Sequence, residues 1–135
     1  MISLLGDANI LRHVALLAAR LQAEPWKDFA DYLQLHFLSF SDLGLDPSDP
    51  DDVVWSRCQE RQVLLLTNNR NDDGPKSLQS TIQRLNQPHS LPVFTIGNAD
   101  SILTSAEYAD RVIDRLLRYL LELDNVRGTG RLFIP

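Results

Sequence analysis

The sequence lacks the features that mark disulfide-rich, membrane-spanning and exported proteins. Its single cysteine, Cys58, excludes an internal disulfide and favours a reducing compartment. No apolar run reaches the roughly 18 residues that suggest a transmembrane helix. The opening stretch MISLLGDANILRH has no positively charged segment of the kind that begins a signal peptide. We therefore expect a cytoplasmic protein that does not associate with membranes.

The sequence also lacks an excess of positive charge and a glycine-rich phosphate loop. It has 13 Lys and Arg against 18 Asp and Glu, for a net charge of −5. Proteins that bind nucleic acid through its phosphates usually present a basic surface, so the few cations here would have to gather on one face. Arg111, Arg115 and Arg118 have the spacing of one helical stripe, with Arg127 and Arg131 further along. Neither GxGxxG nor GxxxxGKS occurs, so dinucleotide or nucleoside triphosphate binding has no support.

What the chain does contain is typical of one globular domain. It has 135 residues, of which 44% are hydrophobic and 23% charged. A chain of this length buries a core without disulfides or structural metals. We expect a single domain over residues 1–135.

Apolar periodicity predicts alternating strands and helices along the whole chain. The predicted strands are 2–6, 35–40, 62–67 and 92–96, with a short edge strand in the tail RLFIP. The predicted helices are 9–22, one opened by Pro25, 51–61, 76–85, and a long one from Thr104 to about Leu123 with Glu107 as its capping-box partner. This alternation predicts an α/β three-layer sandwich with a mainly parallel sheet of four to five strands and right-handed connections.

An acid or an amide follows every predicted strand. The first strand is followed by Asp7 and Asn9, the second by Asp42, the third by Asn68 and its neighbours, and the fourth by Asn98 and Asp100. Because ligands of open α/β sheets bind beyond the carboxyl ends of the strands, these side chains are expected at one edge. Asp and Asn without Cys or His favour a hard cation, Mg²⁺ or Mn²⁺, which can activate water against a phosphodiester. The alternative is that they cap helices and form turns, which is the favoured reading of Asp42.

Four motifs in order resemble the PIN-like domain family, in particular uncharacterised bacterial proteins related to the VapC toxins. They are the opening LLGDANI, the turn DLGL, the helix pattern Asp51-x-x-Val54-x-x-x-Cys58 and the strand VLLLTNNRN. Together they span roughly residues 2 to 100 of this sequence. The resemblance implies a PIN-like, Rossmann-like architecture and a metal-dependent ribonuclease in which acids cluster around Mg²⁺ or Mn²⁺.

The resemblance also implies which residues form the site. Asp7 matches the first acid, Asp51 or its neighbour Asp52 matches the helix acid, and Asp100 matches a fourth acid. The family pattern T-x-D-x-D is changed here, since its two acidic positions hold Asn69 and Asn71, and the nearest acids are Asp72 and Asp73. The implied catalytic residues are Asp7, Asp51, Asp72 and Asp100, and the implied metal ligands are Asp7, Asp51, Asn69, Asn71 and Asp72.

Arginine, lysine and asparagine side chains are the candidates for contact with substrate. Arg70 lies among amides, where its guanidinium fork suits a phosphate or a nearby acid, and Lys76 and Asn9 are the other candidates. The first hypothesis is a ribonuclease for single-stranded or structured RNA, with an antitoxin-like protein partner and a homodimer as the family's further implications. The second hypothesis, motivated by Asn69 and Asn71, is a catalytically weakened domain that serves as a nucleic-acid- or protein-binding regulatory module.

Two further side chains have ordinary explanations in the sequence. His13 follows Asp7 closely, but the three histidines show no metal-ligand spacing, which favours a solvated or capped histidine. Cys58 occupies an inward position of its predicted helix and has no Cys-His-Asp ordering, which favours a small buried residue over a nucleophile.

Overall fold

In the computed structural model, which describes residues 1–70 and 74–135, the strands form one five-stranded sheet in the order 2-1-3-4-5. Every neighbouring pair of these strands is parallel. The strands are β1 (Ile2–Gly6), β2 (Leu35–Leu38), β3 (Val63–Thr67), β4 (Val93–Thr95) and β5 (Arg131–Phe133). The order is a common one among doubly wound α/β proteins.

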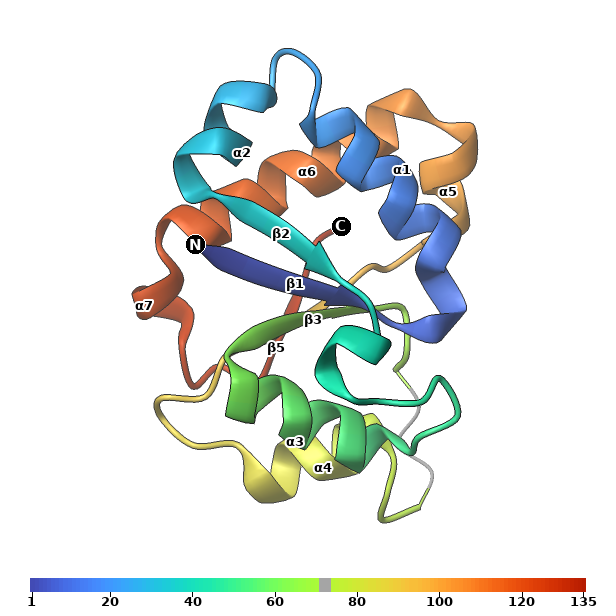
Figure 1. Cartoon of the computed structure of the whole chain (residues 1–135), viewed down its shortest axis with the longest axis vertical. Helices are drawn as coiled ribbons and strands as arrows, with labels where there is room; N and C mark the ends of the chain where they lie inside the picture. The colour runs from blue at the N-terminus through green and yellow to red at the C-terminus, as the bar shows by residue number, and fades with distance from the viewer. Residues whose placement is uncertain (71–73) are drawn as a thin grey trace.

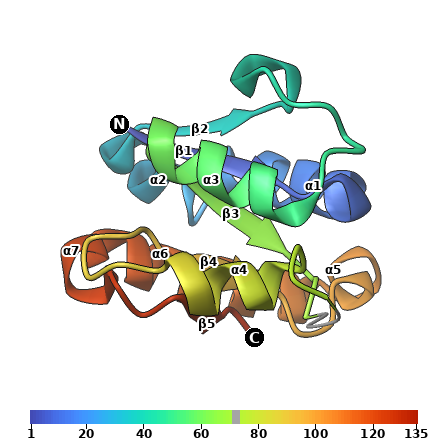
Figure 2. The same cartoon turned by 90° about the horizontal axis from the view of Figure 1, so that it is seen from below.

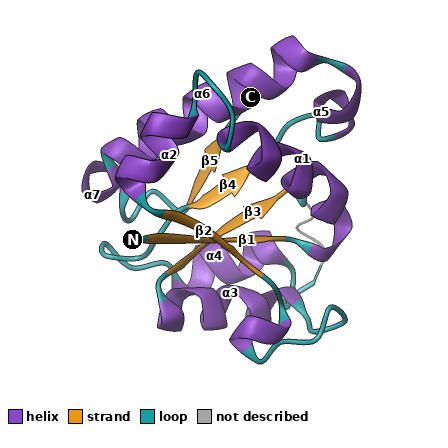
Figure 3. Cartoon of the chain, turned by 45° about the horizontal axis from the view of Figure 1, so that its top comes forward, coloured by secondary structure: helices purple, strands orange, loops and turns teal. Residues whose placement is uncertain are grey.

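Helices cover both faces of this sheet. One face carries α1 (Leu11–Leu21), α2 (Lys27–Leu33), α5 (Asp100–Thr104), α6 (Ala106–Leu121) and α7 (Leu123–Val126), and the other carries α3 (Asp51–Arg61) and α4 (Leu78–Leu85) (Figures 1 and 3). Figure 2 shows α3 and α4 side by side across their face. Short 3-10 helices over Ala8–Ile10 and Ser41–Leu43 follow β1 and β2. The predicted three-layer α/β architecture is therefore confirmed.

The strand alternation divides the core into two halves. Leu4 of β1 and Leu64 of β3 pack with α1 and α6, whereas Leu5 and Leu65 pack with α3 and α4. All five residues of β3 are buried. A strand covered on both faces reads as a continuous apolar run, which explains the sequence VLLLT.

Most of the predicted elements are confirmed, and the differences lie at helix starts and in the second strand, which was predicted over 35–40 but ends at Leu38. The helix predicted from Thr104 begins at Ala106, because the Ser105 hydroxyl accepts the N–H of Tyr108 at 3.1 Å and caps it. The Thr104–Glu107 capping box is therefore wrong, and residues 100–104 form the separate α5. The second helix begins at Lys27 rather than at Pro25. No helix within the described ranges is long and apolar enough to cross a membrane.

Gly6, the last residue of β1, lets α1 approach the sheet closely. A Cβ added at Gly6 would lie 2.8 Å from Cγ2 of Val14, which is itself buried in α1. Such a distance is a steric clash, so a larger side chain at Gly6 would push α1 away from the sheet. This change would occur next to Asp7, the residue that follows Gly6.

We predict that Gly6→Ala destabilises the fold by about 1–3 kcal/mol, the usual cost of overpacking a core. Urea denaturation followed by circular dichroism measures the change in the free energy of unfolding. Gly97→Ala is the matched control, because its added Cβ would meet the nearest atom of Pro135 at an ordinary 3.5 Å. Equal stability of the two variants would contradict this account of Gly6.

Candidate functional site

The carboxyl ends of β1 and β3 bring Asp7 and Thr67 together. Gly6 pairs with Leu66 in the parallel ladder, and the backbone N–H of Asp7 donates to the carbonyl of Leu66 at 2.8 Å. The Thr67 hydroxyl then donates to Oδ2 of Asp7 at 2.9 Å. The side chain of Asp7 is therefore directed across the sheet edge to β3.

Asn69 connects this pair to Asp51 at the start of α3. The backbone N–H of Asn69 donates to the Thr67 hydroxyl at 2.9 Å, and its side-chain amide donates to Oδ2 of Asp51, also at 2.9 Å. The same Asp51 oxygen accepts the N–H of Leu78 at 3.1 Å, which ties the beginning of α3 to the beginning of α4. Asp7, Thr67, Asn69 and Asp51 thus form one hydrogen-bonded group, which we call the carboxyl-edge cluster.

The topology explains why the cluster lies where it does. The chain leaving β1 turns to the face covered by α1, whereas the chain leaving β3 turns to the face covered by α4 (Figure 3). Neighbouring parallel strands whose connections diverge in this way leave their carboxyl ends open, and ligands of doubly wound proteins bind at that position.

The electrostatics of the cluster leave Asp7 with an unfavourable negative charge. Burial raises the pKa of the Asp7 carboxyl above its ordinary value of 3.8, and the charge of Asp51 adds to the rise. The hydrogen bond from Thr67 and the nearby backbone N–H groups of Ala8 and Asn9 oppose it, but the net direction is upward. A cation close to both carboxylates would relieve this cost.

Asp100 lies apart from the hydrogen bonds of the cluster. Its side chain is 91% exposed, and Oδ1 lies 3.0 Å from Nε2 of His13 on α1. The pair joins the beginning of α5 to the first turn of α1, a contact that the sequence did not reveal because the two residues belong to separate helices.

The remaining predicted residues occupy the surface or lie outside the description. The side chains of Asn9, Arg70 and Lys76 are exposed, and no hydrogen bond or ion pair joins these side chains to the described residues. Asn71, Asp72 and Asp73 lie outside the described residues. Among the residues described, no three His, Cys, Asp or Glu side chains are grouped so that they could hold a metal ion.

Asp42 and Cys58 have the structural roles that the sequence favours, a turn residue and a buried core residue. The Asp42 carboxylate accepts the N–H of Ser39 at 2.8 Å, and the hydrogen bonds from Ser39 lower the pKa of Asp42, as expected of a turn residue. Cys58 is buried in the core under α3, where burial raises the pKa of its thiol to about 12. A thiol that stays protonated at neutral pH is a poor nucleophile.

Three groups at the site were missed by the sequence analysis. The Thr67 hydroxyl, the Leu78 N–H and the Arg131 guanidinium all contact the cluster or its loop. Thr67 could have been found as the first polar residue after a run of buried apolar ones. Arg131 could have been found as the only charge in the apolar tail RLFIP.

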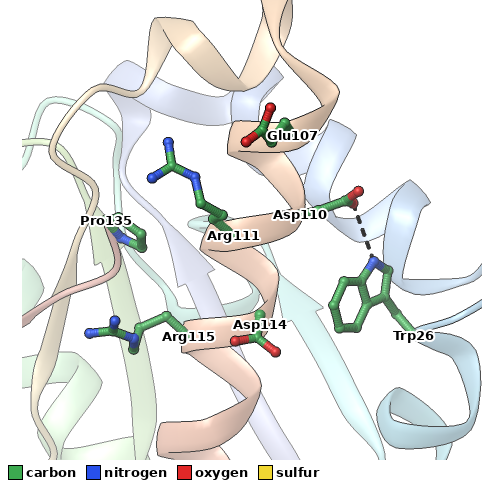
Figure 4. A pocket seen from close by; sticks show the side chains of 7 residues that line it. All are labelled: Trp26, Glu107, Asp110, Arg111, Asp114, Arg115 and Pro135. Atoms are coloured by element: carbon green, nitrogen blue, oxygen red, sulfur yellow. Dashed lines mark hydrogen bonds between the residues drawn. The ribbon is translucent and has the colours of Figure 1, made fainter.

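A wide depression of the described surface lies elsewhere, beside α6. Its volume is about 730 Å³, and it is lined by Trp26, Glu107, Asp110, Arg111, Asp114, Arg115 and Pro135 (Figure 4). Two of its three acids are already engaged: Asp110 accepts from Trp26 and Arg20, and Asp114 accepts from Arg118. Arg111 and Arg115 reach toward Pro135, on the opposite side of α6 from Trp26. We favour the carboxyl-edge cluster as the functional site, because it joins half-buried acidic and amide groups, whereas this depression is wide and open and two of its acids are already paired.

Comparisons with known proteins do not add an assignment. No family model, curated protein or solved structure matches this chain. The geometry of the carboxyl-edge cluster is therefore the observation from which we infer a function.

We predict that Asp7→Asn raises thermal stability at pH 7 by a few degrees. The raised pKa of Asp7 means that ionisation favours the unfolded chain, so its cost is complete above the folded-state pKa and disappears as the pH falls below 3.8. Asparagine keeps an oxygen that can accept the Thr67 hydroxyl but carries no charge. Thermal melts in EDTA between pH 3 and pH 7 should show that the advantage of Asp7→Asn shrinks as the pH falls, because Asp7 of the parent becomes protonated.

The control for this experiment is Asp28→Asn, which removes an equal charge from an exposed position on α2. It should change the melting temperature little at either end of the pH range. An Asp7→Asn variant that is less stable than the parent at pH 7 would contradict the unfavourable ionisation of Asp7.

Proposed function

We propose that this chain is a PIN-like ribonuclease that depends on Mg²⁺ or Mn²⁺. The observation that carries the proposal is the hydrogen-bonded group of two carboxylates and one amide at the diverging ends of β1 and β3. The resemblance of its sequence motifs to PIN-like domains supports the same reaction. Its substrate class is RNA, and an antitoxin-like partner and a homodimer belong to the proposal as the family's implications.

The donor set fits a hard divalent cation. Asp7 and Asp51 supply carboxylate oxygens and Asn69 supplies an amide oxygen, the ligand types that Mg²⁺ and Mn²⁺ prefer. The charge of Asp7 is under-compensated by its surroundings, and a cation would correct this. Asn71, Asp72 and Asp73, which follow in the sequence and lie outside the described residues, are the further ligands of the proposal.

The chain's own residues have separate roles in the proposed reaction. When bound, the cation supplies an activated water and neutralises charge on the scissile phosphate. Thr67 keeps one oxygen of Asp7 oriented, and Asn69 does the same for Asp51. Arg70 and Lys76, both exposed near the loop after β3, would hold the phosphates of the RNA backbone by charge and hydrogen bonding.

We predict that manganese binds the parent protein and supports cleavage of single-stranded RNA. Calorimetric titration with Mn²⁺ should show binding that Asp7→Ala abolishes, since the variant removes a ligand with its charge. Gel analysis of a labelled RNA should show cleavage that EDTA or Asp7→Asn stops. Asp28→Asn, an equal loss of charge on α2, should retain both properties. Absence of Mn²⁺ binding by the parent would refute the proposal.

One observation favours the second candidate, a weakened domain that acts as a regulatory module. Asn69 takes the place of an acid of the T-x-D-x-D pattern, and its amide N–H holds Asp51 without adding negative charge. The affinity of such sites for cations depends on the number of charges, so this replacement weakens metal binding. A parent protein that binds RNA in EDTA and never cleaves it would support this candidate.

We predict that Asn69→Asp exchanges stability for metal affinity. In EDTA the new carboxylate would face Asp51 where an N–H donor now lies 2.9 Å from it, so the variant should melt at a lower temperature than the parent. Mn²⁺ should reverse the loss and raise the melting temperature more than in the parent, because ligand binding to the folded state stabilises it. Differential scanning fluorimetry with a Mn²⁺ series measures both effects. The control Asn98→Asp, beyond β4, should show no Mn²⁺-dependent gain over the parent.

A further inference from the structure

Arg131 extends from the edge of the sheet toward the loop after β3. It is the first residue of β5 and pairs with Val93 of β4. Val93 packs on the side of α3 and α4, so Arg131 lies on that side as well. Its Nε donates to the side-chain oxygen of Gln79 on α4 at 3.0 Å, which confirms this orientation.

The guanidinium then makes two contacts beyond its own strand. Its Nη1 donates to the Thr95 hydroxyl at 2.7 Å and to the backbone carbonyl of Asn69 at 2.8 Å. The first contact fixes the guanidinium on β4, and the second fixes the chain two residues after β3. An arginine held at Nε and Nη1 in this way has little rotational freedom, so it forms a rigid brace between β5 and the loop.

The position of the Arg131 guanidinium is energetically unfavourable in one respect. Nη2 is buried and has no hydrogen-bond partner among the described residues. Leaving donors of a buried cation unsatisfied is unfavourable, because their lost hydration is not replaced. Burial and the nearby charge of Arg70 also lower the pKa of Arg131, while Asp51 opposes this. A neutral side chain that only packed against α4 would avoid these costs. We therefore attribute the role of Arg131 to its hydrogen bond with the Asn69 carbonyl.

Arg131 contacts Asn69, whose backbone and side chain both form hydrogen bonds with other elements. The N–H of Asn69 donates to Thr67, its carbonyl accepts from Arg131, and its side-chain amide donates to Asp51. Because the carbonyl and the N–H are both fixed, the backbone at Asn69 has one orientation, and that orientation directs the amide to Asp51.

We propose that Arg131 is a positioning residue of the carboxyl-edge cluster, which acts by holding the Asn69 carbonyl so that the Asn69 amide meets Asp51. The inference rests on the proposed function for its consequence, metal binding, but the positioning itself is a property of the folded chain without metal. It also links docking of the last strand to the geometry of the site, because Arg131 is the first residue of β5.

The test compares Arg131→Lys and Arg131→Gln with the matched control Arg127→Gln. Arg127 belongs to the same C-terminal segment and also donates from Nη1 to a backbone carbonyl, that of His89, at 2.9 Å. It contacts Gln62, which precedes β3, so it lies at the amino ends of the strands. The control therefore removes the same charge and the same kind of contact at the opposite edge of the sheet.

The first readout is the Asn69 side-chain amide in a ¹H–¹⁵N spectrum of the metal-free protein. Both Arg131 variants should shift the Asn69 amide signals and raise their exchange with water several-fold, whereas Arg127→Gln should leave them at the parent positions. Arg131→Lys keeps a positive charge and a single donor nitrogen, so it should disturb the fold less than Arg131→Gln and show the smaller effect. Unshifted Asn69 signals in both folded Arg131 variants would overturn the proposal.

The second readout is the affinity for Mn²⁺, measured by calorimetry. Arg131→Gln should weaken it roughly tenfold or more, the usual effect of losing a group that orients a metal ligand, and Arg127→Gln should not. If the parent itself binds no Mn²⁺, the proposed function fails, while the amide spectra still decide whether Arg131 positions Asn69. If the parent binds Mn²⁺ and neither Arg131 variant changes the affinity or the spectra, the positioning role fails alone.

Discussion

The parallel pairing of β1 with β3 is the constraint on which the rest of this structure depends. Their ladder runs from the pairing of Ser3 with Val63 to that of Gly6 with Leu66, and it ends where Asp7 donates its N–H to Leu66. Both strands lie inside the sheet and are covered on both faces, so neither can slip in register without moving its buried leucines to the wrong half of the core. The same register that satisfies the core therefore places Asp7 against Thr67.

The site contains groups that are unfavourable for the stability of the isolated chain. The negative charge of Asp7 is partly buried beside a second acid, and Nη2 of Arg131 is buried without a partner among the described residues. Both groups belong to one network of hydrogen bonds that joins Asp7, Thr67, Asn69 and Arg131. Local conflicts of this kind are typical of functional positions, because a ligand rather than the protein resolves them.

The wide depression of the described surface and the cluster of polar side chains lie at different places in this fold. The depression beside α6 is large, but two of its three acids are already bound: Asp110 accepts from Trp26 (Figure 4) and Arg20, and Asp114 accepts from Arg118. The carboxyl-edge cluster is small, yet its four residues come from the start of α3, β3, the loop after β3 and the position directly after β1, and they share one chain of hydrogen bonds. Side chains from separate elements that converge in this way are a stronger sign of function than the volume of a depression.

The sequence by itself determined the elements and their class, because apolar periodicity depends only on neighbours along the chain. VLLLT specifies a strand buried on both faces, and the alternation of strands with helices specifies a parallel sheet with helices on each side. It also placed Asp7 and Asp51 at element ends, where polar residues gather. Helix starts were less certain, since Thr104 and Ser105 are adjacent and both can cap a helix.

Only the tertiary structure decided which of these polar residues meet. Asp7, Asp51 and Asn69 share one network, whereas Asp100 pairs with His13 and Asp42 closes a turn. Arg131, far along the chain, reaches Asn69 because β5 packs beside β4 and not because of any local pattern. The physical reason is that periodicity records which side of an element faces the core, while contacts between ends of different elements depend on strand order and register, which arise only when the sheet assembles.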